Sequence, residues 1–132
     1  MNVIIMGCNR VGAIVARTLA ADGHDVLVID RSAENLRRLP ESGVVSLLLG
    51  DGALDEDLRR AGIDEADAFM ALEQRDARNA LAAQKARCIF KVNKVVCLMS
   101  DPVRQEMYRE LGLEAVSPAT MASNMIIEAL HG

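Results

Sequence analysis

The stretch NVIIMGCNRVGAIVARTLAADGHDVLVID, residues 2–30, decides the fold of this chain. An apolar run at residues 3–6 is long enough for a buried strand, and the turn GCNRVG follows it at once. Residues 13–21 are helix-forming with one apolar face, and a second apolar run at residues 26–29 ends in Asp30. Strand, glycine turn, helix, strand and acid, in this order, predict one βαβ unit.

The turn at residues 7–12 is typical of a βαβ unit that binds a nucleotide. Its helix starts at the carboxyl end of a strand, where unpaired N–H groups and the positive dipole end favour a phosphate. Gly7 permits the tight turn, and Gly12 lets the helix lie close to the strand. Asp30 closes the second strand, near the usual position of the acid that binds ribose hydroxyls.

Asn9 departs from the fingerprint G-x-G-x-x-G, because it stands where the middle glycine lets backbone approach phosphate. Asparagine is among the residues that best tolerate positive φ, so one interpretation is that it merely preserves the turn. The other is that its amide donates to phosphate. Asn9→Gly would tighten nucleotide binding in the first case and weaken it in the second. A third interpretation is a doubly wound domain in which this turn only connects the strand to the helix and binds no nucleotide.

Composition narrows the function classes. The chain has 132 residues, a net charge of −4, 51 % hydrophobic residues and 2 % aromatic ones, which predicts one domain with an aliphatic core. The acidic balance, the lack of long basic runs and the lack of interleaved aromatic residues argue against a nucleic-acid partner. No apolar stretch approaches about 18 residues, so we expect no direct membrane insertion. The sequence begins directly with a core strand, so we expect no signal peptide.

The cysteines predict reduced thiols in a cytoplasm. There are three, widely spaced and without metal-ligand spacing, so no metal site is expected. A thiolate would be favoured at Cys8, at the start of a helix, although we interpret Cys8 as a small turn residue.

The remainder of the chain alternates between helix and strand signals. After a short helix capped by Ser32, we expect strands at residues 44–49, 67–72, 95–99 and 115–116. We expect helices at residues 54–61, 77–89, 102–111 and 118–130, the last two opened by a cap followed by proline. This alternation predicts an α/β fold: a single domain over residues 1–132 with a Rossmann-like, doubly wound parallel sheet of about six strands and helices on both faces.

Several segments together resemble one family, the TrkA N-terminal domain of potassium transport regulators, also called the RCK or KTN domain. They are GCNRVG (7–12), VLVID (26–30), GDGALDEDLRRAGIDEADAFMAL (50–72), Asn79 and ELGLEAVSPATMA (110–122). The resemblance covers nearly the whole chain. It implies a regulatory sensor that binds NAD(H) or an adenine nucleotide (ATP, ADP or AMP) and signals to a membrane potassium transporter or channel subunit. It also implies a place in the cytoplasm or, through that partner, at the inner face of the membrane. Family members often continue into a smaller C-terminal ligand domain.

The resemblance also implies roles for single residues. The turn would hold the phosphates through Gly7, Cys8, Asn9, Arg10, Val11 and Gly12. Asp30 would hold the ribose, with Arg31 near the adenosine. Asp51 and Gly52, where alanine is common in the family, would border the adenine. Leu72, Glu73 and Asn79 would line the rest of the crevice. The residues alone leave other roles open: a helix cap for Asp51, a solvated side chain for Asn79 and a surface position for Arg10.

The sequence favours a sensor over an enzyme. An oxidoreductase needs an acid or base at the nicotinamide. His24 is expected at the end of the sheet away from the crevice, His131 is penultimate, and no lysine follows Tyr108 four residues on. The alternatives are the cofactor domain of an NAD-dependent oxidoreductase and an assembly domain that binds no ligand.

The last helix predicts self-association. Met121, Met125, Ile126 and Leu130 lie on one half of it, while Ile127 falls among polar residues. A second apolar surface of this kind usually marks an interface, although a single surface isoleucine is common. We therefore expect a homodimer or higher homo-oligomer formed through residues 118–132, as the family resemblance also implies.

Overall fold

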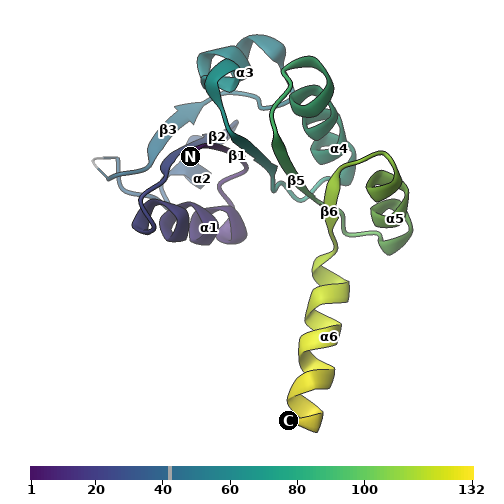
Figure 1. The fold of residues 1–132 in the computed structure, drawn as a ribbon. Coiled ribbons are helices and arrows are strands. Elements are labelled where there is room, and N and C mark those ends of the chain that lie inside the picture. The colour runs from purple at the N-terminus through teal and green to yellow at the C-terminus, as the bar shows by residue number, and fades with distance from the viewer. Residues whose placement is uncertain (42) are drawn as a thin grey trace.

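The computed structural model describes residues 1–41 and 43–132. Its centre is a six-stranded parallel sheet with the strand order β3-β2-β1-β4-β5-β6 (Figure 1). The strands are β1 (Asn2–Met6), β2 (Asp25–Asp30), β3 (Ser46–Leu49), β4 (Ala68–Ala71), β5 (Lys94–Leu98) and β6 (Glu114–Val116). Met6 pairs with Ile29 on one side and with Ala71 on the other, so β1, β2 and β4 end together at one edge. The predicted doubly wound α/β fold is confirmed.

Helices cover both faces of the sheet, as predicted. On one face, α1 (Arg10–Ala21) and α2 (Ala33–Leu36) contribute Ala13, Ala16 and Leu36 to a core with β1 and β2. On the other, α3 (Asp55–Arg60), α4 (Asp76–Gln84) and α5 (Pro102–Glu110) pack over β1, β4, β5 and β6. A short 3-10 helix, η1 (Ile63–Glu65), precedes β4. The strands are continuous apolar runs because their residues alternate between these two cores.

Several element boundaries differ from the predictions, most of them by one or two residues. The third strand begins at Ser46 instead of residue 44, and Val44 is exposed. The short helix α2 is only four residues long, because the backbone then turns through i→i+3 hydrogen bonds from Arg37, Arg38 and Leu39. The helix expected over residues 77–89 is α4 followed by a π-helical turn, η2 (Lys85–Ile89), closed by the Phe90 N–H donating to the Lys85 carbonyl.

The last helix, α6 (Pro118–His131), stands away from the body of the domain (Figure 1). Ser117 caps it by accepting the Thr120 N–H, and Pro118 follows the cap, as predicted. Every residue of α6 is exposed. Within residues 1–41 and 43–132, no helix combines the length and the apolar character that a membrane span requires.

Candidate functional site

The glycines of the 7–12 turn are required by its geometry. Gly7 has φ +111, and a Cβ there would lie 3.1 Å from the backbone nitrogen of Glu73. A Cβ at Gly12 would lie 1.9 Å from the Gly7 carbonyl oxygen, because α1 passes directly over the turn. The turn therefore lies against the end of β4 on one side and the first turn of α1 on the other.

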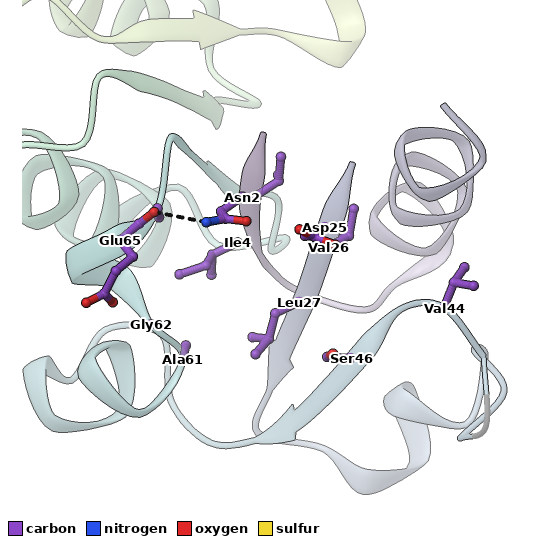
Figure 2. Close-up of a pocket in the computed structure, with 12 residues that line it drawn as sticks. Asn2, Ile4, Asp25, Val26, Leu27, Val44, Ser46, Ala61, Gly62 and Glu65 are labelled. Atoms are coloured by element: carbon purple, nitrogen blue, oxygen red, sulfur yellow. Dashed lines mark hydrogen bonds between the residues drawn. The ribbon is translucent and has the colours of Figure 1, made fainter. Parts of the chain in front are cut away.

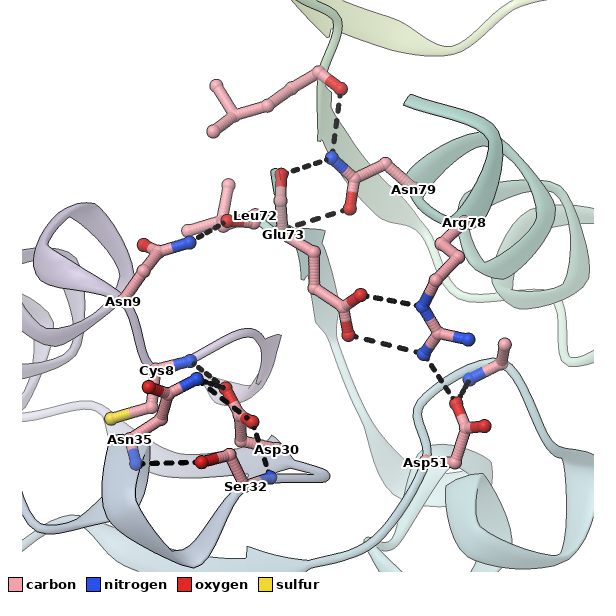
Figure 3. A network of polar contacts seen from close by, with 12 residues as sticks. Cys8, Asn9, Asp30, Ser32, Asn35, Asp51, Leu72, Glu73, Arg78 and Asn79 are labelled. Atoms are coloured by element: carbon pink, nitrogen blue, oxygen red, sulfur yellow. Dashed lines mark hydrogen bonds and ion pairs between the residues drawn. The ribbon is translucent and has the colours of Figure 1, made fainter. Parts of the chain in front are cut away.

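Asn9 serves the turn in a way that neither sequence-based interpretation anticipated. Its φ is −77, so Asn9 does not preserve the turn through a tolerance for positive φ, and that part of the first interpretation is wrong. Its Oδ1 accepts the Gly12 N–H at 3.0 Å, which caps α1. Its Nδ2 donates to the Leu72 carbonyl at 2.7 Å, so the amide ties the turn to the end of β4 (Figure 3).

Asp30 is a nearly buried carboxylate that holds the turn and the start of α2 together. Its Oδ2 accepts the Cys8 N–H at 2.7 Å, and its Oδ1 accepts the Ser32 N–H at 2.8 Å (Figure 3). The Asn35 amide donates to both oxygens at 3.3–3.4 Å. Ser32 caps α2, as predicted. Contact with a ribose at Asp30 remains a prediction.

The expectation of a favoured thiolate at Cys8 is wrong. Cys8 is fully buried, and this burial together with the negative charge of Asp30 raises the pKa of its thiol despite the positive charges of Arg38 and Arg17. The neutral thiol packs as a small turn residue, which agrees with the interpretation from the sequence.

Arg78, which the sequence analysis missed, joins Asp51 to Glu73. Its Nη2 donates to Asp51 Oδ1 at 2.6 Å and its Nε donates to Glu73 Oε1 at 2.7 Å (Figure 3). Asp51 also accepts the Ala53 N–H at 2.9 Å, a capping-type contact within its own turn. Besides this capping-type contact, Asp51 therefore forms a charge pair that joins the loop after β3 to α4, and its contact with an adenine remains a prediction.

Burial and pairing with Arg78 have opposite effects on the pKa of the Asp51 carboxyl. Burial alone would raise the pKa of the Asp51 carboxyl, but the hydrogen bonds from Arg78 and the Ala53 N–H hold that pKa below its ordinary value. On the other partner, the hydrogen bond to Glu73 raises the pKa of the Arg78 guanidinium. Both charges are therefore present near neutral pH, and each stabilises the other.

Asn79 lies behind the crevice and is fully buried, so its interpretation as a solvated residue is wrong. Its Oδ1 accepts the Glu73 N–H, and its Nδ2 donates to the carbonyls of Glu73 and Leu98, all within 3.1 Å. It therefore fixes Glu73 relative to the end of β5. The sequence did carry a signal for its burial, since Asn79 shares a helical period with Ala82, Ala83 and Ala86.

Two cavities lie side by side at the carboxyl ends of the strands, which is where ligands bind in doubly wound sheets. The larger, of about 560 Å³, is lined by Gly7, Asn9, Asp30, Arg31, Ser32, Asn35, Arg38, Glu73, Gln74 and Arg75. The smaller, of about 260 Å³, is lined by Asn9, Arg10, Val11, Leu72, Glu73, Gln74, Asp76, Leu98, Ser100 and Pro118. They share Asn9, Glu73 and Gln74.

The cavities separate the predicted site residues into two groups. Eight of them line one cavity or both: Gly7, Asn9, Arg10, Val11, Asp30, Arg31, Leu72 and Glu73. The other five line neither cavity: Cys8, Gly12, Asp51, Gly52 and Asn79. A Cβ at Gly52 would lie 2.5 Å from the Met6 side chain, so this position is filled by the core. Ser32, Asn35, Arg38 and Arg75 also line the larger cavity, although the sequence did not predict them as site residues.

A third cavity, of about 250 Å³, lies at the other end of the sheet, where β1 and β2 begin (Figure 2). Ile4, Leu27 and Val44 contribute apolar atoms to it, and the Asn2 amide donates to the Glu65 carbonyl at 3.3 Å. His24 belongs to this end as expected, since the amino group of Met1 lies 3.1 Å from its Nδ1. A phosphate site at the start of α1 is far from this end, so we place the candidate site in the two adjoining cavities.

Fold and crevice define a Rossmann-like domain of the nucleotide-binding type. The TrkA-N domain family matches residues 3–118. The chain belongs to this family, as the sequence resemblance implied.

Comparison with known proteins places the family among potassium transport regulators. The chain is 39 % identical over 130 residues to the Trk system potassium uptake protein TrkA of Streptomyces coelicolor, covering 98 % of this chain and 58 % of that protein. It therefore spans little more than half of this relative.

Two solved structures give the comparison in space. The Kef CTD of Shewanella denitrificans in its AMP-bound form has a TM-score of 0.83 at 25 % identity, covering 99 % of this chain and 80 % of the other. The GsuK channel bound to NAD has a TM-score of 0.74 at 20 % identity, covering 89 % of this chain and 21 % of the other, and shares the fold.

Proposed function

We propose that this domain is a nucleotide sensor that binds an adenine nucleotide or NAD(H) in the crevice and regulates potassium uptake or conductance. The observation that carries the proposal is the convergence of the turn, Asp30 and Arg31 on the larger cavity. Asp30 lies where a ribose would be held, and the start of α1 lies where a phosphate would be stabilised. Relatives with AMP or NAD support the choice of ligand class.

A sensor explains the crevice better than an enzyme does. Neither cavity is lined by a histidine, tyrosine or lysine within the part of the chain that the structure describes. Glu73, the one carboxylate common to both cavities, is already paired with Arg78. A hydride-transfer site also needs residues that hold a substrate, and no observation favours such a region here. We therefore propose a regulatory role without catalysis.

Regulation would work by population shift. A nucleotide in the crevice touches loops that follow β1, β2 and β4, so it can favour one arrangement of these loops over another. A partner that contacts the favoured arrangement is then biased by the difference in nucleotide-binding free energy between the two arrangements, and by no more than this difference. Membership in the TrkA-N family supports a membrane potassium transporter or channel subunit as this partner and a place at the cytoplasmic side of the membrane.

The ligand class can be tested with a nucleotide panel. We expect an adenine nucleotide or NADH to raise the melting temperature, and NADH to bind about tenfold more tightly than NADPH, because the Asp30 carboxylate repels a 2′-phosphate. Calorimetric titration of AMP, ADP, ATP, NADH and NADPH measures this order. Asp30→Asn removes the charge and should narrow the difference between NADH and NADPH. Tighter binding of NADPH by the unaltered chain would contradict the assignment of Asp30, and a melting temperature that no nucleotide moves would contradict the proposed function.

We further propose that α6 forms a two-fold symmetric homodimer or a higher homo-oligomer. Its exposed apolar residues run along the whole helix, with Met125 66 %, Ile126 68 % and Leu130 81 % exposed. Ile127, on the other side, is 54 % exposed, so one flat contact would not cover them all. A contiguous apolar surface of this kind marks an interface, and a self-complementary patch is the common basis of homodimers.

Ile127→Glu is expected to weaken this assembly, because it places a charge in the apolar contact. Light scattering at tens of micromolar should give a dimer for the unaltered chain and a larger monomer fraction for the variant. Val44→Glu adds the same charge at an apolar residue that is 82 % exposed and lies outside α6, so it should leave the dimer unchanged. A monomeric unaltered chain, or a variant that assembles as well as the control, would contradict the proposal.

A further inference from the structure

We infer that Asn9 divides the crevice, so that this domain selects an adenine mononucleotide over a dinucleotide. The inference rests on the proposed nucleotide-binding function and concerns which class of nucleotide the site takes. It makes Asn9 a residue that determines specificity.

The two cavities meet at the Asn9 side chain. Asp30, Arg31 and Arg75 line only the larger cavity, and Arg10, Leu98 and Ser100 line only the smaller one. Asn9 is one of the three residues that line both. Its amide reaches from the turn to the Leu72 carbonyl and closes on it at 2.7 Å. Figure 3 shows this bond crossing from the loop after β1 to the loop after β4. A dinucleotide must place its pyrophosphate across the same line, since its two halves lie on opposite sides of this turn.

The same side chain also occupies a phosphate donor. The Gly12 N–H belongs to the first turn of α1, whose N–H groups are the usual partners of a pyrophosphate. Here it donates to Asn9 Oδ1 at 3.0 Å. The Asn9–Leu72 bond would thus block a pyrophosphate that spans both cavities, and the Gly12 N–H would not be free to donate to it. A terminal phosphate that stays within the larger cavity would need neither that space nor that donor.

The charges favour the larger cavity for that phosphate. It is lined by three arginines, Arg31, Arg38 and Arg75, against the two carboxylates of Asp30 and Glu73. The Arg31 and Arg75 side chains are exposed, whereas the Arg38 guanidinium donates to the Cys8 carbonyl and to Asn35 Oδ1. The smaller cavity has Arg10 against the carboxylates of Glu73 and Asp76. Its volume also falls below the roughly 300–1,000 Å³ of sites that bury most of a small ligand.

Two variants distinguish the two effects of Asn9, which are the division of the crevice and the capping of α1. Asn9→Ser keeps a capping oxygen for α1 but is too short to reach Leu72, so it opens the passage. Asn9→Gly opens the passage and also frees the Gly12 N–H. Asn35→Ala serves as the control, because Asn35 lines only the larger cavity and should affect the adenosine half of every nucleotide alike.

Calorimetric titration of ADP and NADH gives the readout. We expect the unaltered chain to bind ADP at least about tenfold more tightly than NADH. Both Asn9 variants should tighten NADH by about tenfold while ADP changes by less than about threefold, and Asn35→Ala should change both ligands by a similar factor. Equal affinities in the unaltered chain, or an unchanged ratio in both Asn9 variants, would overturn the inference while ADP binding still supports the proposed function. If neither ligand binds the unaltered chain or any variant, both fail.

Discussion

Gly12→Ala is expected to destabilise the domain by about 3 kcal/mol or more, which corresponds to a fall in melting temperature on the order of 10 °C. The added Cβ would lie 1.9 Å from the Gly7 carbonyl oxygen. The turn has no room to retreat, because the Gly7 N–H donates to the Ile29 carbonyl at 2.9 Å and Gly7 itself lies against Glu73. Thermal and urea unfolding followed by circular dichroism measure the loss.

Val11→Ala is the matched control for this change. It places the same residue one position earlier in α1, at a site that is 48 % exposed, and should alter stability by no more than about 0.5 kcal/mol. Equal unfolding midpoints for Gly12→Ala and the unaltered chain would mean that the turn and α1 can separate without cost. The close packing described for this site would then be wrong.

Arg78→Met is expected to lower stability by about 2 kcal/mol at pH 7, because it leaves the carboxylates of Asp51 and Glu73 without their charged donor. Methionine keeps much of the volume of the arginine stem, so the change acts mainly on the charge. Without Arg78, the effect of burial on Asp51 is no longer offset by that side chain, so the pKa of the Asp51 carboxyl is higher than in the unaltered chain.

The effect of Arg78→Met should depend on pH. In the unaltered chain the pKa of Asp51 is lower in the folded state than in the unfolded state, so its contribution to stability is present above the unfolded value of about 3.9 and is lost as the pH falls through the folded value. The deficit of the variant should therefore be largest near pH 7 and shrink below about pH 4. Urea unfolding at several pH values measures it.

Arg60→Met is the control for the loss of an arginine. Arg60 is 54 % exposed and pairs with Asp57 three residues away, so its removal should cost less than about 1 kcal/mol at every pH. A deficit for Arg78→Met that stays constant from pH 7 to pH 3.5, or one that matches the control, would contradict the role given to the Arg78 network.

The fold could be predicted because its signals are local. Continuous apolar runs mark strands that are buried on both faces, and caps such as Ser117 followed by Pro118 mark helix starts within a few residues. The errors lie where tertiary contacts set the boundary. Lys85 opens the π-helical turn η2, and its ammonium group pairs with Asp55 and donates to the Ala53 carbonyl at the start of α3. No periodicity in residues 77–89 reports that contact.

The candidate site could be predicted only in part, for the same reason. The turn and Asp30 follow each other along one βαβ unit, so their spacing carries the information. Arg78 binds Asp51 across 27 positions of sequence, and this pairing depends on how α4 packs against the loop after β3. Asn9 was recognised as unusual from the sequence, but its bond to the Leu72 carbonyl depends on the distance between two strand ends.

The isolation of α6 links folding to association. A helix of 14 residues with every side chain exposed is only marginally stable in water, because most helical stability in proteins comes from burying an apolar face. Its apolar residues are exposed along its whole length. A surface that covers them would therefore also supply the free energy that keeps these residues helical. Docking and helix formation would be one cooperative step, and part of the binding free energy would be spent on ordering the chain. The contact would then be weaker than its area suggests, which would suit the proposed regulation, in which a nucleotide in the crevice changes the strength of that contact.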